Sequence, residues 1–233
     1  MTLLKVDKLQ VCYQEIVAVR DLSFSLAAGE SVALLGANGA GKTSAVEAIA
    51  GLIPVKSGSV FFEGEDITRR SASDTARRGL SLVPQWRELF SNFSVEETLI
   101  AGMAAARDRE PRTLDEIYEL FPALAQRRTQ LAGSLSGGEQ QMLAIGRSLI
   151  GRPKAILLDE PSAGLAAGII RFMVETISRI RQTGVALLVV EQKLELAQAL
   201  ADRCLVLSVG RTVLEGPMRE AAHMEQIRGA FFE

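Results

Sequence analysis

Histidine, cysteine and tryptophan are scarce in this 233-residue chain, which has one histidine, two cysteines and one tryptophan. With His223 as the single histidine, neither a histidine-based metal site nor a Ser-His-Asp triad can be assembled. This excludes most hydrolase and metalloenzyme classes. The cysteines, Cys12 and Cys204, lie in apolar strand-like stretches and lack the close spacing of a metal-binding or redox pair. We expect both to be buried thiols in a reducing compartment.

Long apolar runs and an excess of one charge are also absent from the sequence. No run approaches the ~18 to 20 apolar residues that a membrane helix needs, and residues 1–5 show no basic region leading into an apolar one. The formal net charge is -2 and the paired arginines are scattered, so nucleic acid is not an expected partner. These pairs are Arg69/Arg70, Arg77/Arg78 and Arg127/Arg128. We expect a cytosolic protein that reaches a membrane only through its partners.

The composition is that of a soluble globular protein, with 48% hydrophobic and 23% charged residues. Residues 1–29 alternate with a period of two, which predicts antiparallel strands. A continuous apolar run over residues 31–36 predicts a strand buried on both faces of a parallel sheet. After a glycine-rich turn, residues 42–50 are predicted to form a helix.

The middle of the chain, from about residue 94 to 151, has a helical pattern with a capping-box arrangement at Thr113 and Glu116. Further strand-like runs occupy residues 58–64, 80–83, 155–158, 185–190 and 204–207. Helical spacers between the later runs indicate parallel βαβ units. The pattern therefore predicts a layered α/β domain with an inserted helical lobe, and no repeat or linker indicates a second independent domain.

Residues 36–43 read Gly-Ala-Asn-Gly-Ala-Gly-Lys-Thr, which fits the phosphate-binding loop pattern between a buried strand and a helix. Glycines let backbone N–H groups converge on the phosphates, Lys42 supplies a positive charge, and the Thr43 hydroxyl can coordinate Mg²⁺. A chance glycine-rich turn is the alternative, but the strand and helix on either side favour nucleotide binding. The predicted nucleotide-binding residues here are Gly36, Asn38, Gly39, Gly41, Lys42, Thr43 and Ser44.

Two carboxylates, Asp159 and Glu160, follow the apolar run at residues 155–158. They lie at the strand end where an α/β sheet binds nucleotide. Asp159 is predicted to hold Mg²⁺, directly or through water, and Glu160 to orient or deprotonate the attacking water. The alternative is a strand end with two solvated acids, which the nearby phosphate-binding loop makes less attractive.

Residues 135–141 read Leu-Ser-Gly-Gly-Glu-Gln-Gln, which resembles the signature of the ABC ATPase family. Ser136 offers a hydroxyl, Gly137 and Gly138 expose backbone N–H groups, and the helix that follows points its positive end at phosphate. The other interpretation is a turn before a helix, with Ser136 as its N-cap. In the family, the signature of one subunit closes over the γ-phosphate held by the other, in a head-to-tail dimer with two ATP molecules.

The resemblance covers essentially the whole chain and implies an α/β fold with a P-loop (RecA-like), mostly parallel sheet core. An N-terminal antiparallel β layer and an inserted helical subdomain complete the single domain, residues 1–233. Residues 1–90 and 152–233 are expected to form the β layer and core, and residues 91–151 the helical subdomain that carries the signature.

Residues that match other functional positions of the family also occur, in the family's order along the chain. Tyr13 matches the aromatic residue that stacks on adenine, and Gln85 matches the glutamine that touches Mg²⁺ or its water and links core to lobe. An exposed strand tyrosine and a plain polar loop residue are the alternatives. Residues 162–165 match the loop that crosses the dimer interface, although Ala167 and Gly168 stand where many relatives have proline and a bulkier residue.

Gln192 takes the place of the histidine that contacts the γ-phosphate in the family. Its amide can donate a hydrogen bond but cannot carry a proton or a charge at neutral pH. With Glu160, Lys42 and Gln192 as the catalytic residues, we expect hydrolysis that is slowed but not abolished relative to a histidine version.

The pair Glu191 and Gln192, with residues 118–122, 136–147 and 160–162, resembles the ATP-binding subunits of importers for branched-chain amino acids, including related urea-type systems. This implies two membrane-spanning permease subunits, a periplasmic or extracellular solute-binding protein and a second ATP-binding subunit, identical or homologous. The chain would then lie on the inner face of the cell membrane. Residues 86–97 would lie near the groove for a permease helix, with Trp86 serving either coupling or packing.

Three other functions remain open from the sequence. One is an export or lipid-extraction ATPase, in which a histidine at position 192 is expected. A second is a soluble ABC ATPase of translation or DNA repair, which a fused second unit or a coiled-coil insertion would have supported. A third is a regulatory subunit that closes on ATP but scarcely hydrolyses it, for which Gln192 is the support.

Overall fold

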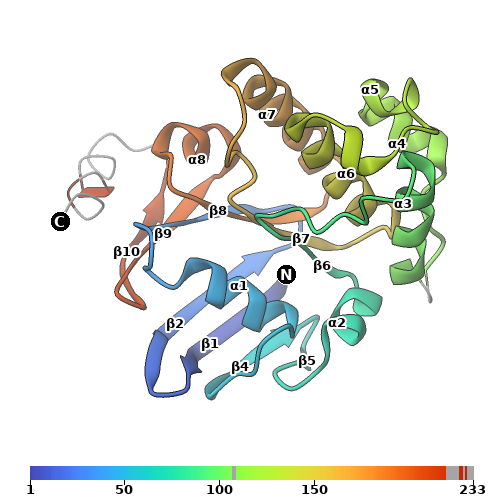
Figure 1. Cartoon of the computed structure of the whole chain (residues 1–233). Helices are drawn as coiled ribbons and strands as arrows, with labels where there is room; N and C mark the ends of the chain where they lie inside the picture. Colours follow the sequence, from blue (N-terminus) through green and yellow to red (C-terminus); the bar gives the residue numbers. More distant parts are fainter. Residues whose placement is uncertain (107–108, 219–225, 228, 230–233) are drawn as a thin grey trace.

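The computed structural model describes residues 1–106, 109–218, 226, 227 and 229, and within them the strands form one ten-stranded sheet. The order across the sheet is β5-β4-β1-β2-β10-β9-β3-β8-β7-β6. The strands are β1 (Thr2–Tyr13), β2 (Ile16–Ala27), β3 (Ser31–Leu35), β4 (Ser57–Phe62), β5 (Glu65–Asp66), β6 (Leu80–Val83), β7 (Ala155–Asp159), β8 (Ala186–Glu191), β9 (Arg203–Ser208) and β10 (Arg211–Pro217). Figure 1 shows the arrangement.

The helices cover the sheet and form a lobe at one side of it (Figure 1). They are α1 (Lys42–Ala50), α2 (Ala72–Arg78), α3 (Val95–Gly102), α4 (Leu114–Leu120), α5 (Pro122–Ala125), α6 (Gly137–Ile150), α7 (Ala167–Gln182) and α8 (Leu194–Leu200), with 3-10 turns η1 (Met103–Ala106) and η2 (Ala132–Ser134). In the part of the chain described here, none of these helices combines the length and the apolar character needed to span a bilayer.

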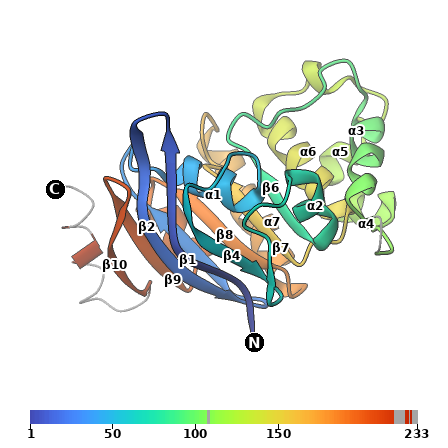
Figure 2. The same cartoon turned by 90° about the horizontal axis from the view of Figure 1, so that it is seen from below.

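The N-terminal strands form an antiparallel layer, as the period-two pattern predicts. Strand β1 pairs antiparallel with both β2 and β4, and β4 pairs antiparallel with β5. Side chains alternate along β2, so that Leu22, Phe24 and Leu26 are buried while their neighbours face outward. Figure 2 shows this layer in front of the remaining strands.

The second part of the sheet is parallel and carries the candidate site. Strand β3 lies between β8 and β9, and β7 lies between β8 and β6, all in parallel pairs. Strand β10 returns antiparallel to β9 and meets β2 through a single parallel pair, Arg211 with Asp21. The two parts of the sheet are therefore joined by a short contact. The predicted mostly parallel core with an added antiparallel layer is confirmed.

Successive side chains of the parallel strands pack into two different apolar clusters, one on each face of the sheet. On β7, Ala155 and Leu157 pack with α1 and the antiparallel strands, whereas Ile156 and Leu158 pack with α3, α4, α6 and α7. Helix α1 is thus enclosed by the two parts of the sheet (Figures 1 and 2). The helical lobe shares its apolar cluster with the sheet face, so burial of that face links the position of the lobe to the core.

Side-chain caps fix where the lobe helices begin. Capping boxes pair Ser94 with Glu97, Thr113 with Glu116, and Ser136 with Glu139, at the starts of α3, α4 and α6. The capping box predicted at Thr113 is confirmed. Helix α2, which the sequence reading did not place, begins after Ser71, whose hydroxyl accepts a hydrogen bond from the Asp74 N–H.

The environment of the cysteines is partly as expected. Cys204 is buried on β9, and burial raises the pKa of its thiol to about 11. The prediction that Cys12 is buried is wrong, because Cys12 lies on the outward-facing side of β1 between buried Val11 and exposed Tyr13 and is only partly covered. Position His223 lies outside the described residues.

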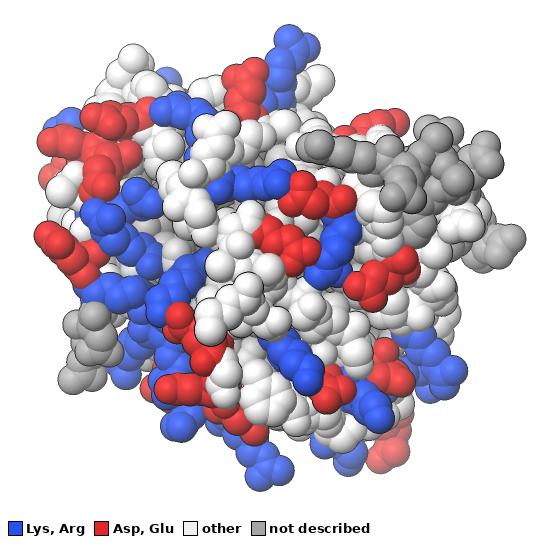
Figure 3. All heavy atoms as spheres, turned by 180° about the vertical axis from the view of Figure 1, so that it is seen from behind, with Lys and Arg blue, Asp and Glu red and all other residues white. Residues whose placement is uncertain are grey.

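Lysine and arginine side chains mix with aspartate and glutamate side chains over the face drawn in Figure 3. Neighbouring opposite charges also form ion pairs, such as Lys154 with Glu63, at 2.6 Å, and Arg181 with Asp202, at 2.6 Å. Long-range fields from such neighbouring opposite charges largely cancel within a Debye length.

Candidate functional site

The candidate site begins where β3 passes into α1 through the phosphate loop, residues 36–43. A Cβ atom on Gly36 would lie 2.3 Å from the Leu207 carbonyl oxygen, so only glycine lets β9 approach the loop this closely. Gly41 adopts a left-handed conformation as the N-cap of α1, and no side chain of the described residues caps that helix. The first N–H groups of α1 are therefore available to an anion.

Lys42 occupies the centre of this loop and is only 4% exposed. Its ammonium donates hydrogen bonds to the carbonyl oxygens of Gly36, at 2.9 Å, and Ala37, at 3.0 Å. It also lies 3.5 Å from Oε1 of Glu160. A buried ammonium held by carbonyls and one carboxylate suits the stabilisation of a negatively charged group placed over the loop.

Asp159, the last residue of β7, is 2% exposed and its Oδ1 atom finds no hydrogen-bond partner among the described residues. Burial raises the pKa of Asp159 to about 6, while a hydrogen bond with the Thr43 side chain acts in the opposite direction. A buried carboxylate oxygen without a partner beside a threonine hydroxyl fits a hard cation such as Mg²⁺. No cluster of three or more potential acidic, histidine or cysteine ligands occurs among the described residues, so phosphate and water would complete the coordination.

Glu160 follows Asp159 and has a left-handed backbone conformation, with φ of 44°. This conformation is uncommon for residues with a side chain, and such strain is concentrated at functional sites. The N–H of Glu160 donates to the Val190 carbonyl at 3.0 Å. This bond fixes the backbone of Glu160 against the end of β8.

Three predicted site residues meet around the Glu160 carboxylate. Gln85 Nε2 donates to Oε2 at 3.1 Å, Gln192 Nε2 donates to Oε1, and Lys42 lies beside the same Oε1. Gln192 Nε2 also donates to Asn38 Oδ1, at 2.6 Å. Residues from the ends of β3, β6, β7 and β8 therefore converge on one carboxylate.

Tyr13, at the end of β1, lies at the edge of this region with its ring exposed. Its hydroxyl donates to Glu47 Oε2 on α1 at 3.5 Å. Burial raises the pKa of Glu47, and the Tyr13 hydrogen bond lowers it. The exposed ring beside α1 is available for stacking on a planar ligand.

The signature segment, residues 135–141, lies at the start of α6. The Ser136 hydroxyl accepts a hydrogen bond from the Glu139 N–H at 3.4 Å, and the Glu139 carboxylate accepts from the Ser136 N–H at 2.9 Å. The interpretation of Ser136 as an N-cap is confirmed. Ser136 and Gly137 are exposed, while Gly138 is buried, where a Cβ atom would lie 2.6 Å from Ile169.

The signature segment and the phosphate loop are not brought together within this chain. Among the hydrogen bonds and ion pairs of the described residues, none joins the two segments. The exposed N-terminus of α6 is therefore open to a group from outside the chain.

A network around Arg87 was not expected from the sequence. Its Nε donates to Gln141 Oε1 on α6 at 3.0 Å, and its Nη2 lies 3.4 Å from the Ala163 carbonyl. Arg147 donates to the carbonyls of Arg87, at 3.1 Å, and Glu88, at 2.8 Å. No local sequence pattern signals these contacts, because they join segments more than 50 residues apart.

Trp86, beside this network, is 81% exposed, so the packing alternative for it is wrong within this chain. Phe90, which is also exposed, packs against Phe93 with ring centroids 5.0 Å apart and the ring planes tilted by 36°. A hollow of about 210 Å³ lies nearby. It is lined by Ala50, Leu52, Ala72, Thr75, Ala76, Leu80, Ser81, Leu82, Pro84, Glu88 and Arg147.

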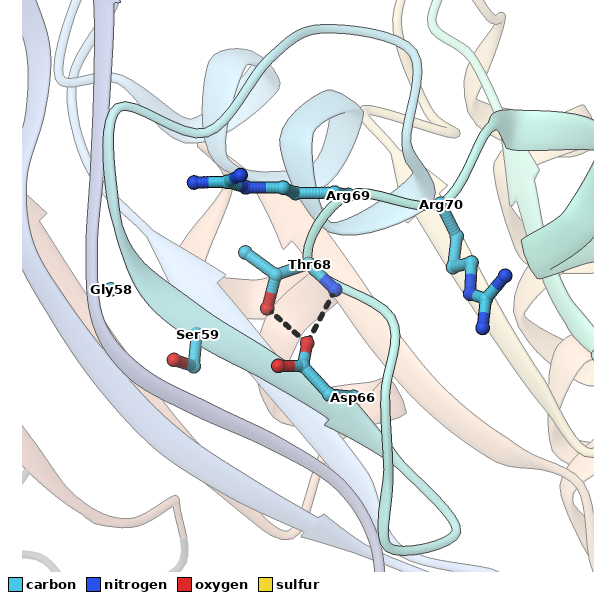
Figure 4. Close-up of a pocket in the computed structure, with 6 residues that line it drawn as sticks. All are labelled: Gly58, Ser59, Asp66, Thr68, Arg69 and Arg70. Atoms are coloured by element: carbon cyan, nitrogen blue, oxygen red, sulfur yellow. Dashed lines mark hydrogen bonds between the residues drawn. The ribbon is translucent and has the colours of Figure 1, made fainter.

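A different hollow, of about 570 Å³, lies at the β4–β5 edge and shares no lining residue with the phosphate loop (Figure 4). There the Asp66 carboxylate accepts hydrogen bonds from the Thr68 N–H, at 2.9 Å, and the Thr68 hydroxyl, at 2.6 Å. Figure 4 shows Arg69 and Arg70 pointing in different directions. This hollow is therefore separate from the candidate site.

The glycine-rich loop between a buried strand and a helix, facing two strand-end carboxylates, defines the class of P-loop nucleotide-binding proteins. The family model described as "ABC transporter" matches residues 19–163. The chain belongs to the ABC transporter family and is an ATP-hydrolysing subunit of that type.

Known proteins similar to this chain cover nearly its whole length. The high-affinity branched-chain amino acid transport ATP-binding protein BraG of Pseudomonas aeruginosa is 41% identical, covering 98% of this chain and 99% of that protein. The lipopolysaccharide export system ATP-binding protein LptB of Haemophilus influenzae is 30% identical, covering 99% and 97%. A solved nucleotide-free ATP-binding cassette from an ABC transporter has a TM-score of 0.85 at 24% identity, covering 98% and 96%.

Proposed function

We propose that this chain is the ATP-binding and ATP-hydrolysing subunit of an importer for branched-chain or other hydrophobic amino acids. The observation that supports ATP hydrolysis is the meeting of three side chains, Lys42, Gln85 and Gln192, around the Glu160 carboxylate. The 41% identity to a branched-chain amino acid transport protein, over nearly the full length of both chains, supports the transport class.

The phosphate loop binds ATP through its backbone N–H groups and the Lys42 ammonium, with Gly36, Asn38, Gly39 and Gly41 shaping the loop. Ser44 adds a hydroxyl at the first turn of α1, and Tyr13 stacks on the adenine. Thr43, Asp159 and Gln85 would hold Mg²⁺. When bound, that ion offsets the negative charge of the phosphates.

Hydrolysis depends on Glu160 as the group that orients and deprotonates the attacking water. Gln85 and Gln192 hold its two carboxylate oxygens, so the side chain is fixed before ATP arrives. Lys42 balances the charge of the carboxylate and remains available to the γ-phosphate. Positioning and charge stabilisation supply most of the catalysis in phosphoryl transfer.

The working form is a head-to-tail dimer with a second ATP-binding subunit, identical or homologous. Ser136, Gly137 and the buried Gly138 present the start of α6 to the ATP held by the partner's phosphate loop. Separation of these two segments within one chain supports a site completed by two chains. Residues 162–165 would lie at the same interface.

One of two membrane-spanning permease subunits docks at the exposed Trp86 and Phe90 and the adjacent hollow, and the chain would then lie on the inner face of the cell membrane. A periplasmic or extracellular solute-binding protein supplies the solute. Closure of the dimer on ATP moves the lobe through Gln85 and its neighbours, so solute choice need not reside in this chain.

Export is the second candidate function, because the lipopolysaccharide export protein LptB matches over nearly the whole chain as well. Uptake of labelled leucine by cells with and without the gene for this chain distinguishes the two. Loss of uptake, restored by the unmutated gene and not by a Lys42→Ala variant, supports import. Unchanged uptake with a changed envelope lipid composition supports export instead.

Sedimentation velocity of a Glu160→Gln variant, with and without Mg-ATP, tests the motor itself. We expect ATP-dependent dimers and turnover at least about 100-fold below that of the unmutated chain, as for loss of a general base. The matched control is Glu175→Gln on the exposed face of α7, which should turn over normally. A variant that stays monomeric, beside an unmutated chain that lacks turnover, would contradict a working dimer of identical chains.

A further inference from the structure

Glu191, the last residue of β8, has a buried carboxylate that has no role in the proposed reaction as described above. It is 2% exposed and lies next to Gln192 in the chain. Burying a charged carboxylate is costly unless hydrogen bonds compensate. The Glu191 carboxylate is buried beside the hydrolysis site, so it needs hydrogen-bond donors that compensate for the lost water.

Donors from two separate loops supply that set. Oε1 of Glu191 accepts a hydrogen bond from the Ser162 N–H at 3.3 Å, and Oε2 accepts one from the Gln192 N–H at 3.2 Å. Burial raises the pKa of the Glu191 carboxylate, and hydrogen bonds from the Ser162 hydroxyl and the Lys193 N–H act in the opposite direction. Ser162 is itself buried. The carboxylate thus lies between the loop after Glu160 and the loop after β8.

The same two loops carry the side chains that meet in the site. Gln192 donates to the Glu160 carboxylate, and the Glu160 N–H donates to the Val190 carbonyl at 3.0 Å. The parallel pairing of β7 with β8 ends at Asp159 and Val190, so the bond from the Glu160 N–H lies at the edge of the ladder and the loops begin just beyond it. The Glu191 carboxylate adds a second attachment on each loop and thereby fixes their relative orientation.

We propose that Glu191 is a positioning residue that holds Gln192 against Glu160 and ties both to residues 162–165. The inference rests on the proposed function, because it assigns Glu191 a part in the hydrolysis carried out there. Movement of residues 162–165 at the dimer interface is transmitted through this carboxylate to Gln192. Glu191 acts through its neighbours and does not touch the nucleotide.

The chemistry of the contacts explains why glutamate is needed at this position. A carboxylate offers only acceptors, and its known partners here are backbone N–H groups and one hydroxyl. A glutamine of the same shape would turn an NH₂ group toward one of these donors, so one loop would lose its attachment. An aspartate keeps the charge but is one methylene shorter and reaches the two loops less well.

Steady-state kinetics of Glu191→Gln, Gln192→Ala and the double variant test the proposal. We expect each single variant to lower kcat by about 10-fold or more with KM for ATP changed less than about 2-fold. The double variant should resemble the slower single variant, because both changes disable the same contact. Glu191→Asp should recover part of kcat.

The matched control is Glu30→Gln, at the opposite end of β3 from the phosphate loop. Glu30 also accepts a backbone N–H, from Ala27 at 2.7 Å, and pairs with Arg203 at 2.5 Å. The Glu30→Gln variant should have lower thermal stability and an unchanged kcat. This result separates a positioning role from a general structural one.

Additive losses in the double variant, or an unchanged kcat for Glu191→Gln, would overturn the proposal. If Glu191→Gln does not fold, Ser162→Ala, which removes the hydroxyl bonded to Glu191, is tested with Gln192→Ala in the same way. A lack of turnover in the unmutated chain would instead contradict the proposed function and is seen before any variant is made.

Discussion

Gln192 and Asn38, 154 residues apart, are joined by a hydrogen bond of 2.6 Å from the Gln192 amide to Asn38 Oδ1. The bond connects the loop after β8 directly to the phosphate loop after β3. Because Gln192 also donates to Glu160, one amide links the loop that would hold the phosphates to the carboxylate that would act on water. The nature of this side chain should therefore set the rate of hydrolysis.

Replacement of Gln192 by histidine should raise kcat for ATP, because an imidazole can carry a proton and a positive charge beside the γ-phosphate. The glutamine amide can only donate a hydrogen bond. Turnover measured from pH 6 to 8 checks this, with Gln182→His at the exposed end of α7 as the control. Equal turnover of Gln192→His and the unmutated chain would show that the substitution is neutral.

Replacement of Asp159 by asparagine should stabilise the protein without metal and nucleotide while abolishing Mg²⁺-dependent turnover. The pKa of Asp159 is raised to about 6 by burial, so the folded state binds the proton more tightly than the unfolded state. Its charged form therefore destabilises the fold above pH 6, by about 3 kcal/mol at most, and this penalty shrinks as the pH falls from 6 toward the ordinary aspartate pKa of about 4.

Urea unfolding of both proteins at pH 8 and pH 5 measures that difference. The advantage of Asp159→Asn in the free energy of unfolding should be largest at pH 8 and should shrink at pH 5. Glu191, whose pKa is also raised, is present in both proteins and cancels in the comparison. An advantage that is equal at the two pH values would show that the charge of Asp159 is not its cause.

Gly36 and Gly39 in the phosphate loop should differ in their tolerance of alanine. A Cβ atom on Gly36 would meet the Leu207 carbonyl at 2.3 Å, whereas none of the described atoms lies within 4 Å of one on Gly39. We expect Gly36→Ala to cost about 3 kcal/mol through overpacking. Gly39→Ala should cost about 1 kcal/mol, for its left-handed backbone alone. Denaturant unfolding compares the two, and equal losses would contradict the contact with β9.

The two cysteines should react with a thiol reagent at very different rates. Cys12 is partly exposed, while the Cys204 thiol is buried and its pKa is raised to about 11. Only the thiolate reacts, and at pH 8 about one Cys204 in a thousand is ionised. We expect one fast thiol in the native protein and two after unfolding, with Cys12→Ser abolishing the fast phase. Rapid labelling of Cys204 would indicate local opening of β9.

Elements with local signals could be predicted from the sequence. The run before Gly36, the glycine-rich loop and the helix after Lys42 could be read in one stretch, because a buried strand, a turn and a helix each leave a pattern in adjacent residues. Helix α2 was missed although Ser71 and Gly79 mark its ends. Seven residues are too few to show a clear helical period.

Contacts between distant segments could not be read in the same way. The meeting of Gln85, Glu160 and Gln192 was expected only through the resemblance to a family, since hydrogen bonds between different strand ends leave no local pattern. The burial of Glu191 was missed because a carboxylate at a strand end usually faces solvent. Cys12 was misplaced because its apolar neighbours concealed the alternation of β1.

The place of β3 between β8 and β9 has a consequence for the newly made chain. Strands β1, β2 and β4 can pair with one another as soon as residue 62 has left the ribosome, whereas the single pair of Asp21 with Arg211 on β10 forms later. Strand β3 finds its neighbours only when residues 186–208 have been synthesised. The phosphate loop is therefore completed near the end of translation, so that truncated chains with the whole loop sequence should still fail to retain ATP.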